Sequence, residues 1–211
     1  MAGFADLDIA ILGSSNAVRI HTNNPQHPSY PNDVLIKNYA RGGATADFNH
    51  RKTFLKQIDE NLPYSTHLII FQGPNNYGNK NWKDFLFDFY VSLIKLMRKT
   101  QKTPKEISIL SPLPRGKSKR SHRSQMAILK RFLKTIKDEG FNVINSYDSL
   151  PNYLKDPENM FGINDRKKGH YVHFSGKIRS HLHKLIGLHI SELRERTEMF
   201  VPTFEFQKLK I

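Results

Sequence analysis

The chain has 211 residues, of which 38% are hydrophobic and 11% aromatic, so it is long and apolar enough to form one domain with a buried core. Its 33 Lys and Arg outnumber its 19 Asp and Glu, giving a formal net charge of +14, which predicts a polyanionic partner, nucleic acid before an anionic membrane surface. The absence of cysteine excludes disulfides, thiolate zinc sites and a cysteine nucleophile. The first residues lack the pattern of a secretory leader and no apolar run is long enough to span a membrane, so we expect an intracellular protein.

Short apolar runs alternate with longer amphipathic segments along the chain. The apolar runs are predicted strands at 7–12, 34–39, 67–71, 107–110 and 141–145. The amphipathic segments are predicted helices at 49–60, 82–99, 124–139 and 174–196. This alternation predicts an α/β fold, a three-layer α/β/α sandwich with a central, mainly parallel five-stranded sheet. We assign residues 1–200 to one domain, and residues 201–211, where apolar and polar residues alternate, to a C-terminal arm that packs on the body.

Polar and glycine-containing motifs follow three predicted strands, and a fourth precedes the last predicted helix. They read Gly-Ser-Ser-Asn at 13–16, Arg-Gly-Gly-Ala-Thr at 41–45, Gly-Pro-Asn-Asn at 73–76 and His-Tyr-Val-His-Phe-Ser at 170–175. Taken singly, each has an ordinary explanation as a helix cap, a tight turn or a solvated side chain. The carboxyl ends of parallel strands share one edge of a sheet, however, so the motifs are expected to meet there.

In this order, the four motifs resemble those of the SGNH (GDSL-type) hydrolases over residues 8–176. The resemblance implies that Ser15 is the nucleophile and His173 the general base. It also implies that the Gly43 backbone N–H and the Asn75 side-chain amide donate to the oxyanion. Such a set is chemically coherent, because a hydroxyl needs a base to become a nucleophile and its tetrahedral intermediate needs donors.

Two positions depart from the family pattern. Ser14 stands where the family has aspartate in its first motif, and His170 stands where it has the aspartate that orients the base. Asp165 is near in sequence and could substitute for that aspartate, but its spacing from His173 does not match the family. A second histidine cannot replace a carboxylate, so these departures predict an inert or very slow enzyme, a pseudo-hydrolase. The alternative is a serine esterase or acetylhydrolase that uses Ser15 and His173.

Two other kinds of site are weaker candidates. Gly13-x-Ser15-x-Ala17 approaches the nucleophile elbow of α/β-hydrolases, but it lacks the last glycine and comes too early in the chain. The histidines of the C-terminal third have no clustered carboxylate or thiol beside them, so we expect no metal and no cofactor.

Positive charge is concentrated in two stretches that contain no acidic residue, 107–137 and 166–191. Acid-free stretches of this length are unusual for a merely solvated surface and favour phosphate binding. We predict an RNA-binding surface at the same sheet edge, made of Arg19, Arg41, Arg115, Lys117, Lys119, Arg120, Arg123, Arg166, Lys167 and Lys168.

A basic domain with SGNH motifs and an altered triad also resembles the C-terminal domain of the Oskar family, which has this fold and binds RNA. That resemblance implies a non-enzymatic domain that binds mRNA, with a role in germ-plasm assembly alongside other ribonucleoprotein components in cytoplasmic granules. Esterase domains of retrotransposon proteins are the competing resemblance, because they share a stretch similar to Pro-Leu-Pro-Arg at 112–115. Attachment to anionic membranes is a third and weaker reading, because no strongly amphipathic basic helix with exposed aromatic residues is found.

Overall fold

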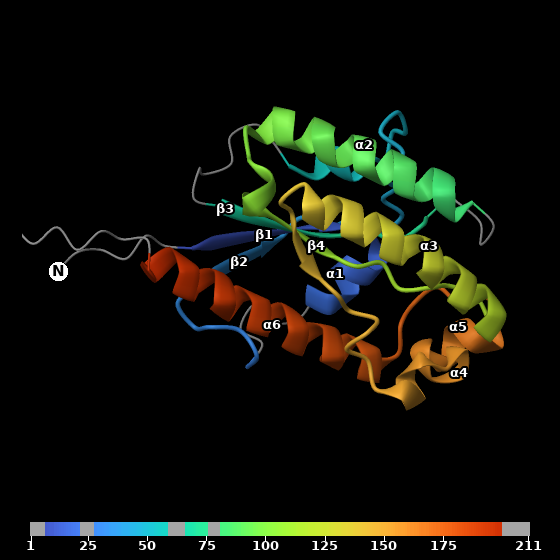
Figure 1. Ribbon diagram of the computed structural model, residues 1–211. Helices are drawn as coiled ribbons and strands as arrows, with labels where there is room; N and C mark the ends of the chain where they lie inside the picture. The colour runs from blue at the N-terminus through green and yellow to red at the C-terminus, as the bar shows by residue number, and fades with distance from the viewer. Residues whose placement is uncertain (1–6, 22–27, 59–65, 76–80, 200–211) are drawn as a thin grey trace, which may run out of the picture.

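The computed structural model describes residues 7–21, 28–58, 66–75 and 81–199. Its centre is a sheet of five parallel strands in the order β2-β1-β3-β4-β5 (Figure 1). The strands are β1 (Asp8–Gly13), β2 (Leu35–Asn38), β3 (Thr66–Phe71), β4 (Ile107–Leu110) and β5 (Asn142–Ile144). The predicted α/β fold is confirmed, and all five strands form where apolar runs predict them.

Helices cover both faces of the sheet, and together they give the three layers seen in Figure 1. The helices are α1 (Ser15–His21), α2 (Trp82–Thr100), α3 (Lys119–Asp138), α4 (Pro157–Met160), α5 (Ile163–Lys167) and α6 (Gly176–Met199). Helices α1 and α6 contact each other on one face, and α2 and α3 contact each other on the other. Helix α3 begins earlier than its apolar pattern predicts, because the Ser118 side chain caps it by accepting a hydrogen bond from the Ser121 N–H.

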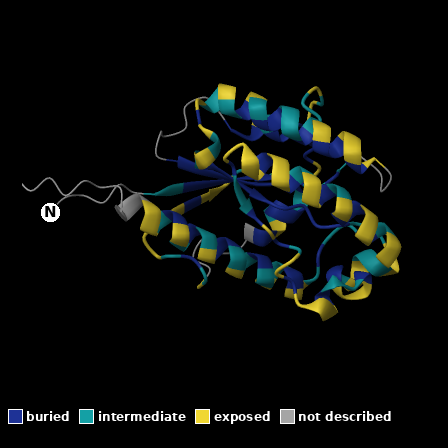
Figure 2. Ribbon diagram, viewed as in Figure 1, coloured by how far each residue is buried: buried dark blue, intermediate teal, exposed yellow. Residues whose placement is uncertain are grey.

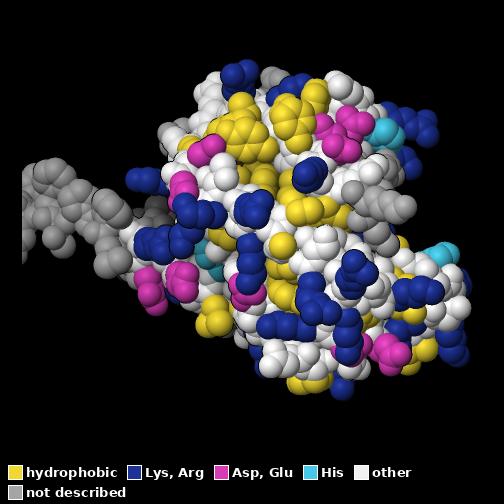
Figure 3. Space-filling view, turned by 45° about the vertical axis from the view of Figure 1, so that its right-hand side comes forward, with side chains coloured by type: hydrophobic (Ala, Val, Ile, Leu, Met, Phe, Trp, Pro, Cys, Tyr) yellow, Lys and Arg dark blue, Asp and Glu magenta, His cyan; other side chains and the backbone are white. Residues whose placement is uncertain are grey.

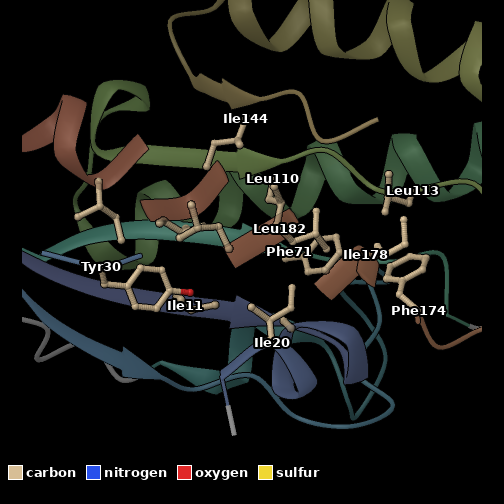
Figure 4. Packing of buried hydrophobic residues seen from close by; sticks show 14 of the residues in the cluster. Ile11, Ile20, Tyr30, Phe71, Leu110, Leu113, Ile144, Phe174, Ile178 and Leu182 are labelled. Carbon is tan, nitrogen blue, oxygen red and sulfur yellow. The ribbon is translucent and has the colours of Figure 1, made fainter. Parts of the chain in front are cut away.

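Two hydrophobic clusters fill the spaces between the sheet and its helices. Alternate residues of β1 serve the two clusters, Ile9 and Ile11 on the side of α6 and Ala10 and Leu12 on the side of α2. Figure 4 shows Ile178 and Leu182 of α6 packed against the sheet, with Phe174 just before that helix. The helix faces turned to the sheet are buried and the opposite faces are exposed (Figure 2). Burial of these apolar faces holds the helices against the sheet, and the ends of its strands carry the site.

The α-helix predicted at 49–60 does not form in the described part of that segment, residues 49–58. In its place the chain has turns followed by a 3-10 helix at Phe54–Gln57. Backbone hydrogen bonds from the Thr45 N–H to the Lys52 carbonyl and from the Phe54 N–H to the Thr45 carbonyl hold the chain back against residues 44–46. These tertiary contacts override the helical spacing of the apolar residues.

The predicted C-terminal arm at 201–211 lies outside the described residues. Among the helices that the structure describes, none is long and apolar enough to cross a membrane.

Candidate active site

The turn after β1 presents the predicted nucleophile. Gly13 has a φ of 145°, and a side chain there would place its Cβ 1.9 Å from the Phe71 carbonyl oxygen, so only glycine fits. The buried Gln57 side chain accepts from the Gly13 N–H at 2.8 Å and donates to the Gly13 carbonyl at 2.7 Å. This reciprocal pair fixes the turn that carries Ser15, the partly exposed first residue of α1.

The buried Ser14 hydroxyl connects this turn to the end of β3. Its Oγ accepts a hydrogen bond from the Gly73 N–H at 3.4 Å, at the position where the family resemblance would place aspartate. The Ser14 N–H donates to the Phe71 carbonyl at 3.3 Å. The first and third motifs are therefore joined as expected.

The second and third motifs come together as the predicted oxyanion donors. The Asn75 Nδ2 donates to the Ala44 carbonyl at 2.8 Å, and the Thr45 hydroxyl donates to the Asn75 carbonyl at 3.2 Å. Gly43 is exposed with a φ of 75°, and within the described chain its N–H has no hydrogen-bond acceptor. One hydrogen of the Asn75 amide and the Gly43 N–H are thus free to donate to a ligand.

The predicted base, His173, has a carboxylate partner. Its Nδ1 lies 3.0 Å from the Oδ2 of Asp165 on α5, and its backbone N–H donates to the same oxygen at 2.7 Å. The Val172 N–H adds a third hydrogen bond at 3.2 Å. Burial alone would raise the pKa of the Asp165 carboxyl, but the hydrogen bonds from His173 and Val172 outweigh it and hold that pKa below its ordinary value.

The shape of the loop between Asp165 and His173 brings these two side chains together, although they are eight positions apart in the sequence. Gly169 and Tyr171 both have positive φ, 68° and 45°, which turns the chain back on itself. The His170 N–H donates to the backbone carbonyl of Asp165 at 2.9 Å, while the His170 side chain is exposed. The expectation that the base lacks a carboxylate partner, drawn from His170, is therefore corrected, because a longer loop places Asp165 within hydrogen-bond distance of the His173 ring.

Asn16 on α1, the helix that begins at Ser15, forms hydrogen bonds to the loop that carries His173. Its Nδ2 donates to the Val172 carbonyl at 3.1 Å, and its Oδ1 accepts from the Phe174 N–H at 3.4 Å. These bonds bracket His173 on both sides. In the described part of the chain no hydrogen bond joins Ser15 directly to His173, as is common in hydrolases without substrate.

Arg115, predicted to bind RNA, lies inside this site. Its guanidinium donates to the Pro74 carbonyl at 3.1 Å and to the Asn75 Oδ1 at 3.4 Å. The buried Gln125 side chain holds its backbone, accepting from the Arg115 N–H at 2.8 Å and donating to its carbonyl at 3.0 Å. Burial lowers the pKa of the Arg115 guanidinium and the charge of Asp165 partly restores it, so this arginine stays cationic beside Asn75.

Two hollows adjoin the site and meet at Phe174. The smaller, with a volume of about 10 Å³, is lined by Asn16, Phe71, Gly73, Pro74, Asn75, Leu113, Arg115 and Phe174. The larger is an open groove of about 780 Å³, and His173 and Asp165 form part of its wall. The first has room for about one water-sized group.

The other predicted RNA-binding residues lie around the same edge. Lys117, Lys119, Arg120 and Arg123 are exposed at or before the start of α3, and Lys119 forms an ion pair with Asp156 at 2.6 Å. Arg19 is exposed on α1, Arg41 is exposed after β2, and Arg166, Lys167 and Lys168 close α5. Figure 3, which turns the end with α4 and α5 forward, shows Lys and Arg side chains outnumbering those of Asp and Glu over its lower half.

Sequence reasoning missed several groups that build the site. Asn16, Gln57 and Gln125 are buried amides whose motif gives no signal, because their roles depend on contacts between distant segments. Asp165 did carry a signal, because it is the only acid between Glu158 and Glu192. Among the described residues, no group of three or more His, Asp and Glu is arranged to hold a metal ion.

No family model and no curated protein sequence matches the chain. Solved structures do share its fold. A GDSL-like lipase from Bacteroides thetaiotaomicron aligns with a TM-score of 0.58 and 13% identity, covering 89% of each chain. An acetylxylan esterase from Geobacillus stearothermophilus aligns with a TM-score of 0.55 and 14% identity over 90% of this chain and 96% of that one. A carbohydrate esterase family 3 protein from Talaromyces cellulolyticus gives a TM-score of 0.55 and 13% identity over 90% and 99%. The fold is therefore that of the SGNH hydrolases.

Proposed function

We propose that this protein is a serine esterase that hydrolyses short acyl esters. The observation that carries the proposal is the Asp165–His173 pair, because its absence was the reason to expect an inactive enzyme. The structural neighbours, which are lipases and esterases by name, support the same proposal.

In this proposal each group of the site has a role. Asp165 occupies Nδ1 of His173, which leaves Nε2 to take the proton as the Ser15 hydroxyl attacks the ester carbonyl. The Gly43 N–H and the Asn75 amide donate to the oxyanion that forms. His173 then gives its proton to the departing alcohol, and a water molecule repeats the sequence on the acyl-enzyme with His173 again as base. The negative charge of Asp165 stabilises the imidazolium at each stage.

The size of the small hollow supports a short acyl group. Asn75 and Arg115 line it, so it adjoins the oxyanion donors, and its volume of about 10 Å³ leaves little room beyond a methyl group. An acetyl group therefore fits the proposed acyl side better than a long chain.

The proposal is tested with 4-nitrophenyl acetate and its longer-chain homologues. We expect the wild-type protein to release 4-nitrophenol with a preference for the acetyl ester, and Ser15→Ala to reduce this to the rate without enzyme. Ser124→Ala, an exposed serine on α3, is the matched control and should keep full activity. Turnover that survives Ser15→Ala, or no turnover by the wild type, would overturn the proposal.

RNA binding is a second proposal, supported by the charge of +14 and by a separate hollow lined by Lys119, Arg123 and Lys155 beside the ring of Tyr147. The resemblance of the sequence to the Oskar family favours the same function.

Phosphate contacts would make the affinity for RNA fall steeply as the salt concentration rises. Arg120→Glu with Arg123→Glu should weaken binding of a single-stranded RNA, measured by fluorescence anisotropy. Arg131→Glu with Lys137→Glu, the same charge change further along α3, should weaken it much less. Equal losses would mean that net charge alone governs binding.

A further inference from the structure

The large groove beside His173 has an unusual concentration of positive charge. Four cationic residues from three helices line it, Arg19 of α1, Arg166 of α5, and Lys177 and Arg179 of α6. Two carboxylates also line it, Glu158 and Asp165, but Asp165 is already engaged by His173. The charge of the groove is therefore positive once the catalytic pair is set aside.

These cations lack protein counter-ions. In the described parts of the chain none of the four forms an ion pair, whereas Lys119, Lys130 and Lys134 of α3 do. The Nε of Arg166 is buried and has no hydrogen-bond partner there. The Arg166 side chain as a whole is only half-buried, so its terminal guanidinium nitrogens, rather than the buried Nε, are the donors that a ligand in the groove would meet.

The chemistry of the site decides which part of a substrate lies in the groove. The base that activates Ser15 must next protonate the departing oxygen, so the alcohol part of the ester lies on the side of His173. The His173 side chain forms part of the groove wall and is 26% exposed. The acyl part is directed instead to the small hollow beside Asn75, with Phe174 between the two.

We propose that the esters cleaved here carry a negatively charged group, a phosphate, sulfate or carboxylate, on their alcohol part, and that Arg19, Arg166, Lys177 and Arg179 bind it. This inference rests on the proposed esterase function and adds the substrate class. A guanidinium suits such a ligand because it offers paired N–H donors to two oxygens of the anion.

A matched pair of acetyl esters tests the inference, 4-acetoxybenzenesulfonate, whose alcohol part is anionic, and the neutral 4-acetoxybenzenesulfonamide. We expect kcat/KM to be about tenfold higher for the sulfonate, the effect of one charge-assisted hydrogen bond, and the preference to shrink as salt rises. Arg166→Gln with Arg179→Gln should abolish the preference. Arg131→Gln with Lys137→Gln, which removes the same charge from the exposed side of α3, should keep it. Equal kcat/KM for the two esters, or a preference that survives the groove variant, would overturn the inference.

A binding measurement separates this inference from the esterase proposal. Calorimetry with the alcohol product, 4-hydroxybenzenesulfonate, requires no turnover. We expect binding to the wild type that is lost in the Arg166→Gln, Arg179→Gln variant. Binding of this kind without any hydrolysis would support the anion site and overturn the esterase function. Hydrolysis of both esters without such binding would support the esterase function and overturn the anion site.

Discussion

The Asp165 carboxylate accepts hydrogen bonds from both the ring Nδ1 and the backbone N–H of His173, so it fixes the position and the tautomer of the same residue. A histidine held only by the hydrogen bond at its ring could still shift with its backbone. Here the backbone bond, at 2.7 Å, also sets the distance between the α5 helix and the loop of the base. Orientation of the base and stabilisation of its charged form therefore depend on one carboxylate.

Replacing that carboxylate should disable the enzyme without unfolding it. Asp165→Asn keeps the size of the side chain but removes the charge, and an amide can hold the wrong tautomer of His173. We expect kcat for an aryl acetate to fall about 10³- to 10⁴-fold with little change in KM. Asp138→Asn, an exposed site at the end of α3, should keep full activity. A normal kcat for Asp165→Asn would show that the pair has no role in catalysis.

Arg115 should act through Asn75. Its guanidinium donates to the Asn75 Oδ1 while the Nδ2 donates to the Ala44 carbonyl, so the amide is held at both ends and its second Nδ2 hydrogen is available to the proposed oxyanion. Arg115→Met keeps much of the side-chain packing but frees the amide, so kcat should fall about tenfold or more with KM nearly constant. Arg115→Lys keeps the charge and should recover part of the rate. Steady-state kinetics with circular dichroism as the folding control would measure this, and full kcat in Arg115→Met would contradict it.

Gln57 should matter to stability more than its polar side chain suggests. Gln57→Leu leaves the buried Gly13 N–H without its acceptor, whereas the Gly13 carbonyl loses one hydrogen bond and keeps the one from the Arg41 N–H at 3.1 Å. A buried N–H without an acceptor costs about 1–3 kcal/mol, so we expect the free energy of unfolding, measured in urea, to drop by about that amount. The exposed neighbour Lys56→Leu should change it by less than about 0.5 kcal/mol. A drop no larger for Gln57 than for Lys56 would argue against this role.

Acid should weaken the fold through His67 on β3. Burial, with the charges of His189 and Lys102, lowers the pKa of His67 to about 3. The unfolded chain takes up this proton near pH 6.5 but the folded chain does not, so stability falls as pH drops from about 6.5 to about 3. The total effect is as much as about 4 kcal/mol. In urea titrations, His67→Gln should flatten this pH dependence, whereas the exposed His170→Gln should leave it unchanged. An identical slope in both variants would refute the assignment.

Gly187 of α6 should not tolerate alanine. Alanine normally stabilises a helix interior by about 1 kcal/mol relative to glycine. At this position, however, its Cβ would lie 1.9 Å from the Ser29 carbonyl oxygen. We therefore expect Gly187→Ala to lower the melting temperature, with a loss of about 2–3 kcal/mol. Ser180→Ala, exposed on the same helix, should raise it slightly. A melting temperature above wild type for Gly187→Ala would contradict the close approach.

The strands could be predicted from sequence because a buried parallel strand is a continuous apolar run, and the Gly13 and Gly73 positions mark where two of them end. Helix α1 could not, because seven residues are too few to show a helical period. The helix expected at 49–60 had the period but was overridden by the pairing of Thr45 with Thr53.

The candidate site was predictable where a motif is contiguous and not where it depends on loop geometry. Ser15, Gly43, Asn75 and His173 stand at strand ends that the apolar pattern locates. The role of Asp165 depends instead on the positive φ values of Gly169 and Tyr171, and backbone reversal of this kind leaves no periodic trace in the sequence. Ser15, Gly43, Asn75 and His173 could thus be assigned in advance, whereas Asp165 could be named only as a possible substitute until the fold placed it beside His173.

Three side-chain amides, those of Asn16, Gln57 and Gln125, hold the three catalytic loops in register. None of them titrates, and none depends on a counter-ion. A higher ionic strength will therefore weaken the attraction of anions to the cationic groove without disturbing these amide hydrogen bonds. The loops are thus positioned by neutral amides that salt does not screen, whereas His173 and Asn75 are also held by the charged groups Asp165 and Arg115.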